Sequence, residues 1–198
     1  MRLLFVHAHP VPESLNTALR DVAVETARAQ GHEVRVIDLC AEGFNPVMST
    51  EERRSYTENV SIPADLVLHV DALRWADGLI LIYPTWWYAQ PAILKGWIDR
   101  VWRPGIAFSL HDEGQRLRPA LTNIGLIGVI TSFGSPWWFW TFLMGAPGRK
   151  IILRGLRYCT NRRTKTFWLG LHAIDDQTEL ACSRYIDRVR ARIARIPV

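Results

Sequence analysis

Cysteine is scarce in this chain, and the three that occur, Cys40, Cys159 and Cys182, are widely separated and form no CxxC pair. Three distant cysteines argue against a disulfide framework and favour a reducing compartment. Long apolar runs are also missing, since no stretch approaches the roughly 20 apolar residues that a membrane-spanning helix requires. The apolar run before His7 is too short for the core of a signal peptide. These absences predict a cytoplasmic protein with no transmembrane segment.

Several diagnostic motifs are absent as well. The chain has no GxGxxG turn of the usual dinucleotide-binding kind, no GxxxxGK followed by Ser or Thr, and no GxSxG nucleophile turn. His7 and His9 lie two residues apart without thiolate or carboxylate partners at ligand spacing, so we expect no metal site. The net charge is only +5, and no dense basic stripe or readout element accompanies it. We therefore expect no nucleic-acid binding.

What is present is a regular alternation of strand-like and helix-like segments in 198 residues, 48% of them hydrophobic. This length fits a single domain over residues 1–198. Apolar runs predict strands at 3–6, 33–37, 78–83, 123–131 and 166–171. Periodicity and caps predict helices at 15–29, 64–76 and 178–195 and one opened by Pro91, with a partly helical loop around 46–54. The pattern predicts an α/β three-layer sandwich whose five-stranded parallel sheet has the flavodoxin-like order 2-1-3-4-5.

Ligands of such sheets bind beyond the carboxyl ends of the strands, near the point where the strand order reverses. The segments to inspect are therefore 7–16, 84–90 and 131–135. The first, HAHPVPESLN, runs into a helix whose N-terminus, with Ser14, Asn16 and the two histidines, could cradle a phosphate. The alternative is that Ser14 only caps the helix and that His9 satisfies a backbone group.

The second segment, YPTWWYAQPAILKGWIDRVW, holds three consecutive large aromatics, Trp86, Trp87 and Tyr88, in a short loop. They cannot all point into one core from that loop, so some must line a cavity or an interface. A planar ring system needs flat apolar walls and backbone donors at its edge, which this loop could supply. The alternative is that the tryptophans plug the end of the sheet or form a dimer contact.

These two segments together carry a resemblance. HAHPVPESLN, followed some 65 residues later by YPTWWYAQPAILKGWIDRVW, resembles the NAD(P)H:quinone oxidoreductase (DT-diaphorase-like) family. The resemblance extends over roughly residues 3–130 and weakens afterwards. It implies a flavodoxin-like homodimer with FAD, or FMN in some relatives, with NAD(P)H as a transient electron donor and a quinone-like acceptor reduced by ping-pong hydride transfer.

The resemblance also implies positions for the cofactor. By position, the segment that holds the flavin phosphate and ribityl chain is matched by His9, Ser14, Leu15 and Asn16. The loop along the isoalloxazine is matched by Pro84, Thr85, Trp86, Trp87 and Tyr88. Thr85 stands where many relatives have Gln or Leu, so a Gln side-chain contact would be lost.

The third segment, ITSFGS, is similar to the family's second flavin loop, usually Thr-Thr-Gly-Gly. Thr131, Ser132, Phe133 and Gly134 match it by position, and Phe133 replaces a glycine, which narrows the site or adds a wall. A plain strand-ending turn is the alternative. Family members often carry a Tyr and a His shortly afterwards, but Phe139 and Gly145 occupy those positions here. Neither offers a side-chain proton, so we name no catalytic side chain.

Two further segments stand out, PWWFWTFLM at 136–144 and the run 149–165 with seven basic and no acidic residues. The first, with Trp137, Trp138 and Trp140, could be a dimer seam, a quinone-binding wall or a patch on the membrane surface; we favour a seam that roofs the site. The second could attract NAD(P)H phosphates or be a solvated face. A different function is also open, a flavin-binding ancillary subunit of a membrane transport system, as some relatives are for potassium efflux.

Overall fold

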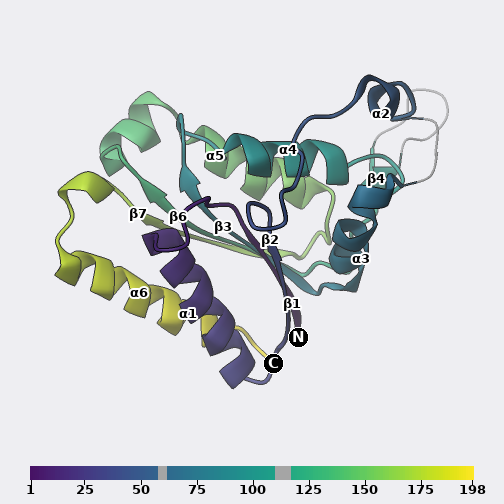
Figure 1. The fold of residues 1–198 in the computed structure, drawn as a ribbon. Coiled ribbons are helices and arrows are strands. Elements are labelled where there is room, and N and C mark those ends of the chain that lie inside the picture. The colour runs from purple at the N-terminus through teal and green to yellow at the C-terminus, as the bar shows by residue number, and fades with distance from the viewer. Residues whose placement is uncertain (58–61, 110–116) are drawn as a thin grey trace.

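The computed structural model describes residues 1–57, 62–109 and 117–198. Its centre is a parallel sheet of five strands in the order β2-β1-β3-β6-β7 (Figure 1). The strands are β1 (Arg2–His7), β2 (Glu33–Asp38), β3 (Gly78–Thr85), β6 (Leu126–Phe133) and β7 (Lys165–Leu171). This confirms the predicted flavodoxin-like sheet, because β6 and β7 are the fourth and fifth strands of the predicted order.

The burial of the strands follows their place in the sheet. Every residue of β6 is buried, and so is every residue of β3 except Thr85, whereas the edge strands β2 and β7 remain partly exposed. Continuous apolar runs are typical of strands covered on both faces. Both central strands extend further than the sequence indicated. Pro84 and Thr85 end β3, and residues 132–133 extend β6 beyond the predicted end at Thr131, so these positions belong to strands and not to the loops expected there.

Helices cover both faces of the sheet (Figure 1). On one face, α1 (Leu15–Ala29) and α6 (Glu179–Ile193) lie side by side over β1, β3 and β6. Both begin as predicted, since Ser14 and Thr178 each accept a hydrogen bond from the backbone N–H three residues on. On the other face lie α3 (Val67–Trp75), preceded by a 3₁₀ turn at Ala64–Leu66, and α4 (Ala92–Val101). A shorter α2 (Thr50–Arg54) lies in the predicted partly helical loop.

One close approach locks the loop before α2 against α4. A Cβ on Gly96 would lie only 2.3 Å from the carbonyl oxygen of Pro46, so only glycine allows this contact. Beside it the indole of Trp97, fully buried, donates a hydrogen bond to His69 Nδ1 at 3.3 Å. The second face is therefore closely packed around α4, and α4 in turn fixes where the loop after β3 ends.

The chain between β6 and β7 has structure that the sequence did not indicate. It forms two π-helical segments, η2 (Phe139–Leu143) and η3 (Ile151–Leu156), joined by the short α5 (Pro147–Lys150). A two-stranded ribbon, β4 (Phe108–Ser109) with β5 (Arg118–Pro119), lies between α4 and β6, and a 3₁₀ turn η4 (Ile174–Asp176) precedes α6. Throughout residues 1–57, 62–109 and 117–198, every helix is too short or too polar to traverse a lipid bilayer.

Candidate functional site

The carboxyl ends of β1, β3 and β6 are neighbours in the sheet. His7 at the end of β1 pairs in register with Ile82, and Thr85 at the end of β3 pairs with Phe133 at the end of β6. The strand order reverses between β1 and β3, which is where open parallel sheets bind their ligands. The structure therefore brings the three predicted site segments to one edge.

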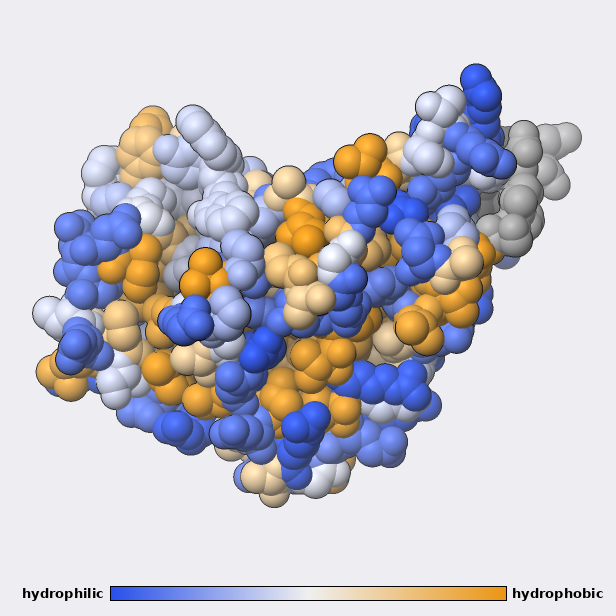
Figure 2. Space-filling view, viewed as in Figure 1, coloured by the Kyte–Doolittle hydropathy of each residue, from blue (hydrophilic) through white to orange (hydrophobic). Residues whose placement is uncertain are grey.

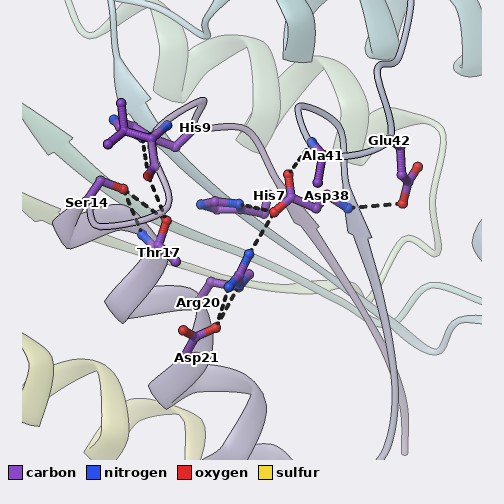
Figure 3. Close-up of polar contacts among 10 residues, drawn as sticks. His7, His9, Ser14, Thr17, Arg20, Asp21, Asp38, Ala41 and Glu42 are labelled. Atoms are coloured by element: carbon purple, nitrogen blue, oxygen red, sulfur yellow. Dashed lines mark hydrogen bonds and ion pairs between the residues drawn. The ribbon is translucent and has the colours of Figure 1, made fainter.

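The loop after β1 leads into the N-terminus of α1 (Figure 3). The Ser14 hydroxyl accepts a hydrogen bond from the Thr17 N–H at 3.1 Å, and the Thr17 hydroxyl donates to the Val11 carbonyl at 3.2 Å. His9 Nδ1 lies 3.1 Å from the Val11 nitrogen. Capping is thus one role of Ser14. The other N–H groups of the first turn have no intrahelical acceptor by geometry, and with the helix dipole they favour an anion.

Asn16 joins this loop to β6. Its side chain is 3% exposed, and its amide donates a hydrogen bond to Ser132 Oγ at 3.0 Å, although the two residues are 116 positions apart. The Asn16 Oδ1 is buried and has no partner among the described residues. A buried acceptor left unpaired costs free energy, so a bound donor at this point would be favoured.

The ends of β3 and β6 are tied together by their hydroxyls. Thr85 Oγ1 and Thr131 Oγ1 are 2.9 Å apart, and the Tyr185 hydroxyl of α6 donates to the Thr131 carbonyl at 3.0 Å. Thr131 is completely buried. Its position in β6 gives it a structural role beneath the site, whereas Thr85 faces the edge.

The loop after β3 is a tight two-residue turn. The backbones of Trp86 and Ala89 exchange two hydrogen bonds of 3.1 Å each, and the central residues have φ of 47° at Trp87 and 64° at Tyr88. A turn with two positive φ values normally contains Gly or Asn, so two bulky aromatics here are strained. Both tryptophans of this loop are exposed, Trp86 at 47% and Trp87 at 91%.

The segment after β6 holds this turn in place. The buried indole of Trp140 in η2 donates to the Tyr88 carbonyl at 3.1 Å, and the side chain of Gln90 donates to the Gly148 carbonyl at 3.0 Å. A Cβ on Gly148 would lie 3.3 Å from Ala89 Cα. The strained turn is thus supported by contacts more than fifty residues away in the chain.

Two adjoining hollows lie between the turn and the end of β6, and we call them together the sheet-edge groove. One has a volume of about 280 Å³ and the other about 530 Å³, and both are bordered by Thr85, Trp87 and Gly134. A Cβ added to Gly134 would lie 3.5 Å from a carboxylate oxygen of Asp175, so a side chain there would take up part of the groove. The groove has an aromatic wall and a floor of backbone.

Phe133 does not form the aromatic wall that the sequence suggested. Only 1% of it is exposed, because its ring stacks on His172 with a centroid distance of 4.0 Å and contacts Trp140 at 4.6 Å. The residue borders the groove but contributes little surface to it. Its effect is indirect, since the stack anchors the aromatic cluster that supports the turn.

A buried polar group beside the first loop was missed by sequence reasoning (Figure 3). His7 Nδ1 lies 2.9 Å from Asp38 Oδ2, which also accepts a 2.7 Å hydrogen bond from Arg20. Burial lowers the pKa of His7, and the hydrogen bond to the Asp38 carboxylate offsets this only in part. Burial raises the pKa of Asp38, but the hydrogen bonds to His7 and to the Ala41 N–H, together with the charges of His7 and Arg20, hold that pKa below its ordinary value. His7 and Asp38 lie at the ends of two strands that are adjacent in the predicted order. The predicted topology therefore already indicated that these two side chains would lie close together.

The predicted Tyr and His positions provide no acid or base. Phe139 lies in η2 against Tyr88, with a ring-centroid distance of 5.8 Å, and Gly145 adopts a positive φ of 68°. Polar groups that face the groove are Thr85, Ser132, Ser135 and Asp175, together with backbone amides. The groove therefore offers hydroxyl and carboxylate groups beside its aromatic residues, and the positions predicted for Tyr and His direct no acid or base at it.

An exposed apolar patch adjoins the groove. We define the η2 patch as Trp137, Trp138, Phe142 and Leu143, whose exposed fractions are 56%, 57%, 73% and 68%. Figure 2 shows pale and hydrophobic atoms gathered at the upper left, over the η2 region of Figure 1. Exposed aromatics in such number are typical of an interaction surface.

Comparison with known proteins agrees with the architecture. A family model described as the flavodoxin-like fold matches residues 1–193. The NAD(P)H:quinone oxidoreductase structure from Methanothermobacter marburgensis superposes with a TM-score of 0.80 at 25% identity, over 98% of this chain and 96% of that one.

Curated relatives share part of the chain. The ribosyldihydronicotinamide dehydrogenase-like protein traD of Penicillium crustosum is 37% identical over an alignment of 132 residues, and the match covers 59% of this chain and 49% of that protein. NAD(P)H dehydrogenase (quinone) 1 of Cavia porcellus is 34% identical over an alignment of 132 residues, and the match covers 57% of this chain and 48% of that protein. The chain therefore spans about half the length of these relatives.

Proposed function

Because the chain belongs to the flavodoxin-like fold family, we propose that it binds a flavin and transfers two electrons from NAD(P)H to a quinone or a similar acceptor. The observation that carries this proposal is the sheet-edge groove, which lies at the carboxyl ends of β3 and β6, between an exposed aromatic turn and the end of β6. β3 is also one of the two strands between which the strand order reverses. The names of the quinone-reducing relatives support the choice of reaction.

The residues present fit a flavin. The first turn of α1, with Ser14, Leu15 and Asn16, would hold the phosphate and the ribityl chain, and His9 borders it. The unpaired Asn16 Oδ1 is a ready acceptor for a ribityl hydroxyl. The turn Trp86–Tyr88 would lie along one side of the flavin ring. Pro84, Thr85 and the backbone of Ser132 to Gly134 would lie along another side of it. FAD and FMN both suit this arrangement.

A bound flavin supplies hydride chemistry and can return two electrons to an acceptor. The protein's part is to position the ring and stabilise charge on it. Backbone N–H groups near Gly134 are the donors available for negative charge that grows on the ring, since a preorganised donor needs no rearrangement during the reaction. The exposed face of Trp87 leaves room for the nicotinamide and the acceptor to enter in turn, which corresponds to ping-pong kinetics.

A second copy of the chain would cover the η2 patch. Its exposed tryptophans lie beside the groove, so a homodimer that buried them would also roof the site. The three cysteines are free in the structure, in keeping with the reducing, cytoplasmic compartment that we infer. Joint burial of the patch and the groove would place the acceptor between subunits.

The same patch supports a second candidate function. A flavin-binding ancillary subunit of a membrane transport system would use the η2 patch to contact its partner, and it would not need an acid or base near the ring. Capture of such a transporter, together with negligible NAD(P)H oxidation by the flavin-loaded protein, would favour this role over the reductase.

Steady-state kinetics test the reductase directly. NAD(P)H and a water-soluble benzoquinone are varied against each other with the flavin-loaded protein, and parallel double-reciprocal lines are expected. Intersecting lines would contradict ping-pong transfer, and the absence of NAD(P)H oxidation with either nicotinamide would contradict the reductase itself. Trp87→Ala is expected to raise the KM for the acceptor, whereas Trp75→Phe, far from the groove on α3, is expected to leave it unchanged.

A further inference from the structure

A second cavity lies at the opposite end of the sheet from the groove. It has a volume of about 840 Å³ and is bordered by β5, η3 and the turn that precedes β7. That turn is tied to the start of β6, since Thr164 Oγ1 donates to the Ile124 carbonyl at 2.8 Å. β6 is eight residues long, which corresponds to about 25 Å. A flavin bound in the groove would therefore not reach this cavity.

The polar lining of this cavity is strongly cationic. Four arginines border it, Arg118, Arg154, Arg157 and Arg162, and the described residues of its lining include no carboxylate. None of the four forms an ion pair with any carboxylate of residues 1–57, 62–109 and 117–198. Guanidinium groups drawn together without counter-charge repel one another, and a bound anion would relieve that repulsion.

Local structure fixes part of this arginine cluster. Arg157 Nε donates to the Thr164 carbonyl at 3.0 Å, and the buried hydroxyl of Thr160 donates to the Arg157 carbonyl at 2.8 Å. Arg154 comes from η3, a π-helical segment, and such segments occur often at functional sites. A guanidinium held by one N–H keeps its remaining donors free for a ligand, at a lower entropy cost than a freely moving side chain.

The remaining lining is aromatic and apolar. Tyr158 is 57% exposed beside the arginines, and Leu117, Pro119 and Leu153 complete the wall. A flat ring next to a cluster of guanidinium groups matches a ligand with a planar base at one end and phosphates at the other. The volume lies within the range of small-molecule sites, and the concave shape suits a compact ligand better than a membrane or a nucleic-acid strand.

We propose that this cavity, the arginine cavity, is a binding site for a nucleoside phosphate, separate from the flavin groove. The phosphates would contact Arg118, Arg154, Arg157 and Arg162, and the base would stack on Tyr158. Arg118 and Arg154 are exposed and make no contact that holds the fold together among the described residues, so they are the positions at which to test the site.

The experiment titrates ADP into the flavin-loaded protein by calorimetry, so that the groove is already filled. ADP is expected to bind, and the double variant Arg118→Ser/Arg154→Ser is expected to raise its Kd by about a hundredfold, since each lost charge-assisted contact is worth about tenfold. Tyr158→Ala is expected to weaken ADP and to leave inorganic pyrophosphate unaffected. Arg163→Ser is the matched control, because Arg163 lies in the same turn but outside the cavity lining.

Four results would overturn the proposal. The first is no binding at about 1 mM ADP, and the second is equal binding of ADP by the double variant and the parent. The third is a raised KM for NADPH in the double variant, which would make the arginines part of the electron-donor site. The fourth is binding of vesicles of phosphatidylserine in preference to ADP, which would make this face a membrane contact. Unfolding curves and flavin content of every variant show that the fold is intact.

Discussion

The side-chain amide of Asn16 donates a 3.0 Å hydrogen bond to the hydroxyl of Ser132, and this single contact joins the first turn of α1 to the end of β6. Both partners are buried, at 3% and 7% exposed. The segment expected to hold the phosphate and the segment expected to border the ring are therefore set relative to each other before any cofactor binds. Such preorganisation lowers the cost of binding.

Ser132→Ala is expected to leave the Asn16 amide buried without a partner. The free energy of unfolding should fall by about 1–3 kcal/mol, and flavin should bind more weakly. Chemical denaturation of the flavin-free protein measures the first effect. In the cycle with Asn16→Ala, the double variant should lose less than the sum of the two single variants. Additive losses would show that the contact contributes nothing.

The strained turn predicts a variant that is more stable than the parent but binds flavin less tightly. Trp87 has a φ of 47° and is 91% exposed, so Trp87→Gly should relieve strain and lose little packing. We expect the free energy of unfolding to rise by about 1 kcal/mol, while the Kd for flavin also rises because the aromatic wall is gone. Trp86→Gly is the matched control, since Trp86 has no positive φ and its change should lower stability.

The indole of Trp140 is expected to matter through its N–H. Trp140→Phe keeps an aromatic ring against Phe133 but removes the donor to the Tyr88 carbonyl, which should lower the free energy of unfolding by about 1 kcal/mol. Because the turn is then less well held, flavin fluorescence should show a more mobile ring. Trp138→Phe, at the exposed residue directly before η2, should change neither. Identical results for the two variants would contradict the role given to Trp140.

The buried pair of His7 and Asp38 predicts a pH dependence. The pKa of His7 is lowered in the folded state, so the unfolded chain binds more protons as the pH falls below the ordinary histidine pKa. The free energy of unfolding should therefore decrease from about pH 7 to about pH 5. The pKa values of His32, His69 and His172 are also lowered. The contribution of His7 is therefore measured as the difference between the pH dependence of unfolding in the parent and in a His7 variant.

His7→Gln should make that decrease shallower, because one of the contributing groups no longer titrates. Urea unfolding at several pH values measures the slope. His9→Gln is the comparison variant, since the His9 ring hydrogen-bonds only to Val11 in its own loop. A slope unchanged by His7→Gln would mean that the buried pair has no part in the pH dependence.

The sequence predicts the sheet well because its signal is local. The buried runs of β3 and β6, the cap at Ser14 and the amphipathic pattern of α6 each indicate their element within a few residues. The boundaries were less accurate where polar or aromatic residues continue a strand. Thr85 and Ser132 look like loop residues in sequence, yet they extend β3 and β6. The Thr85 hydroxyl lies 2.9 Å from the hydroxyl of Thr131.

The parts of the site that escaped prediction depend on distant contacts. The side chain of Trp140 reaches Tyr88 from a π-helical segment that has no clear sequence signature, and Phe133 turns away from the groove to stack on His172. Neither follows from residue spacing. The His7–Asp38 pair is different, because adjacent strand ends in the predicted order place the two residues side by side.

Flavin binding is the central claim, and the most direct measurement is the identification of the cofactor. The protein is purified, the bound small molecule is released by heat and identified by mass spectrometry, and the stripped protein is titrated with FAD and FMN. We expect a yellow protein with one flavin per chain, FAD or FMN, that the stripped protein binds again. A colourless protein that takes up neither flavin would contradict the proposed function.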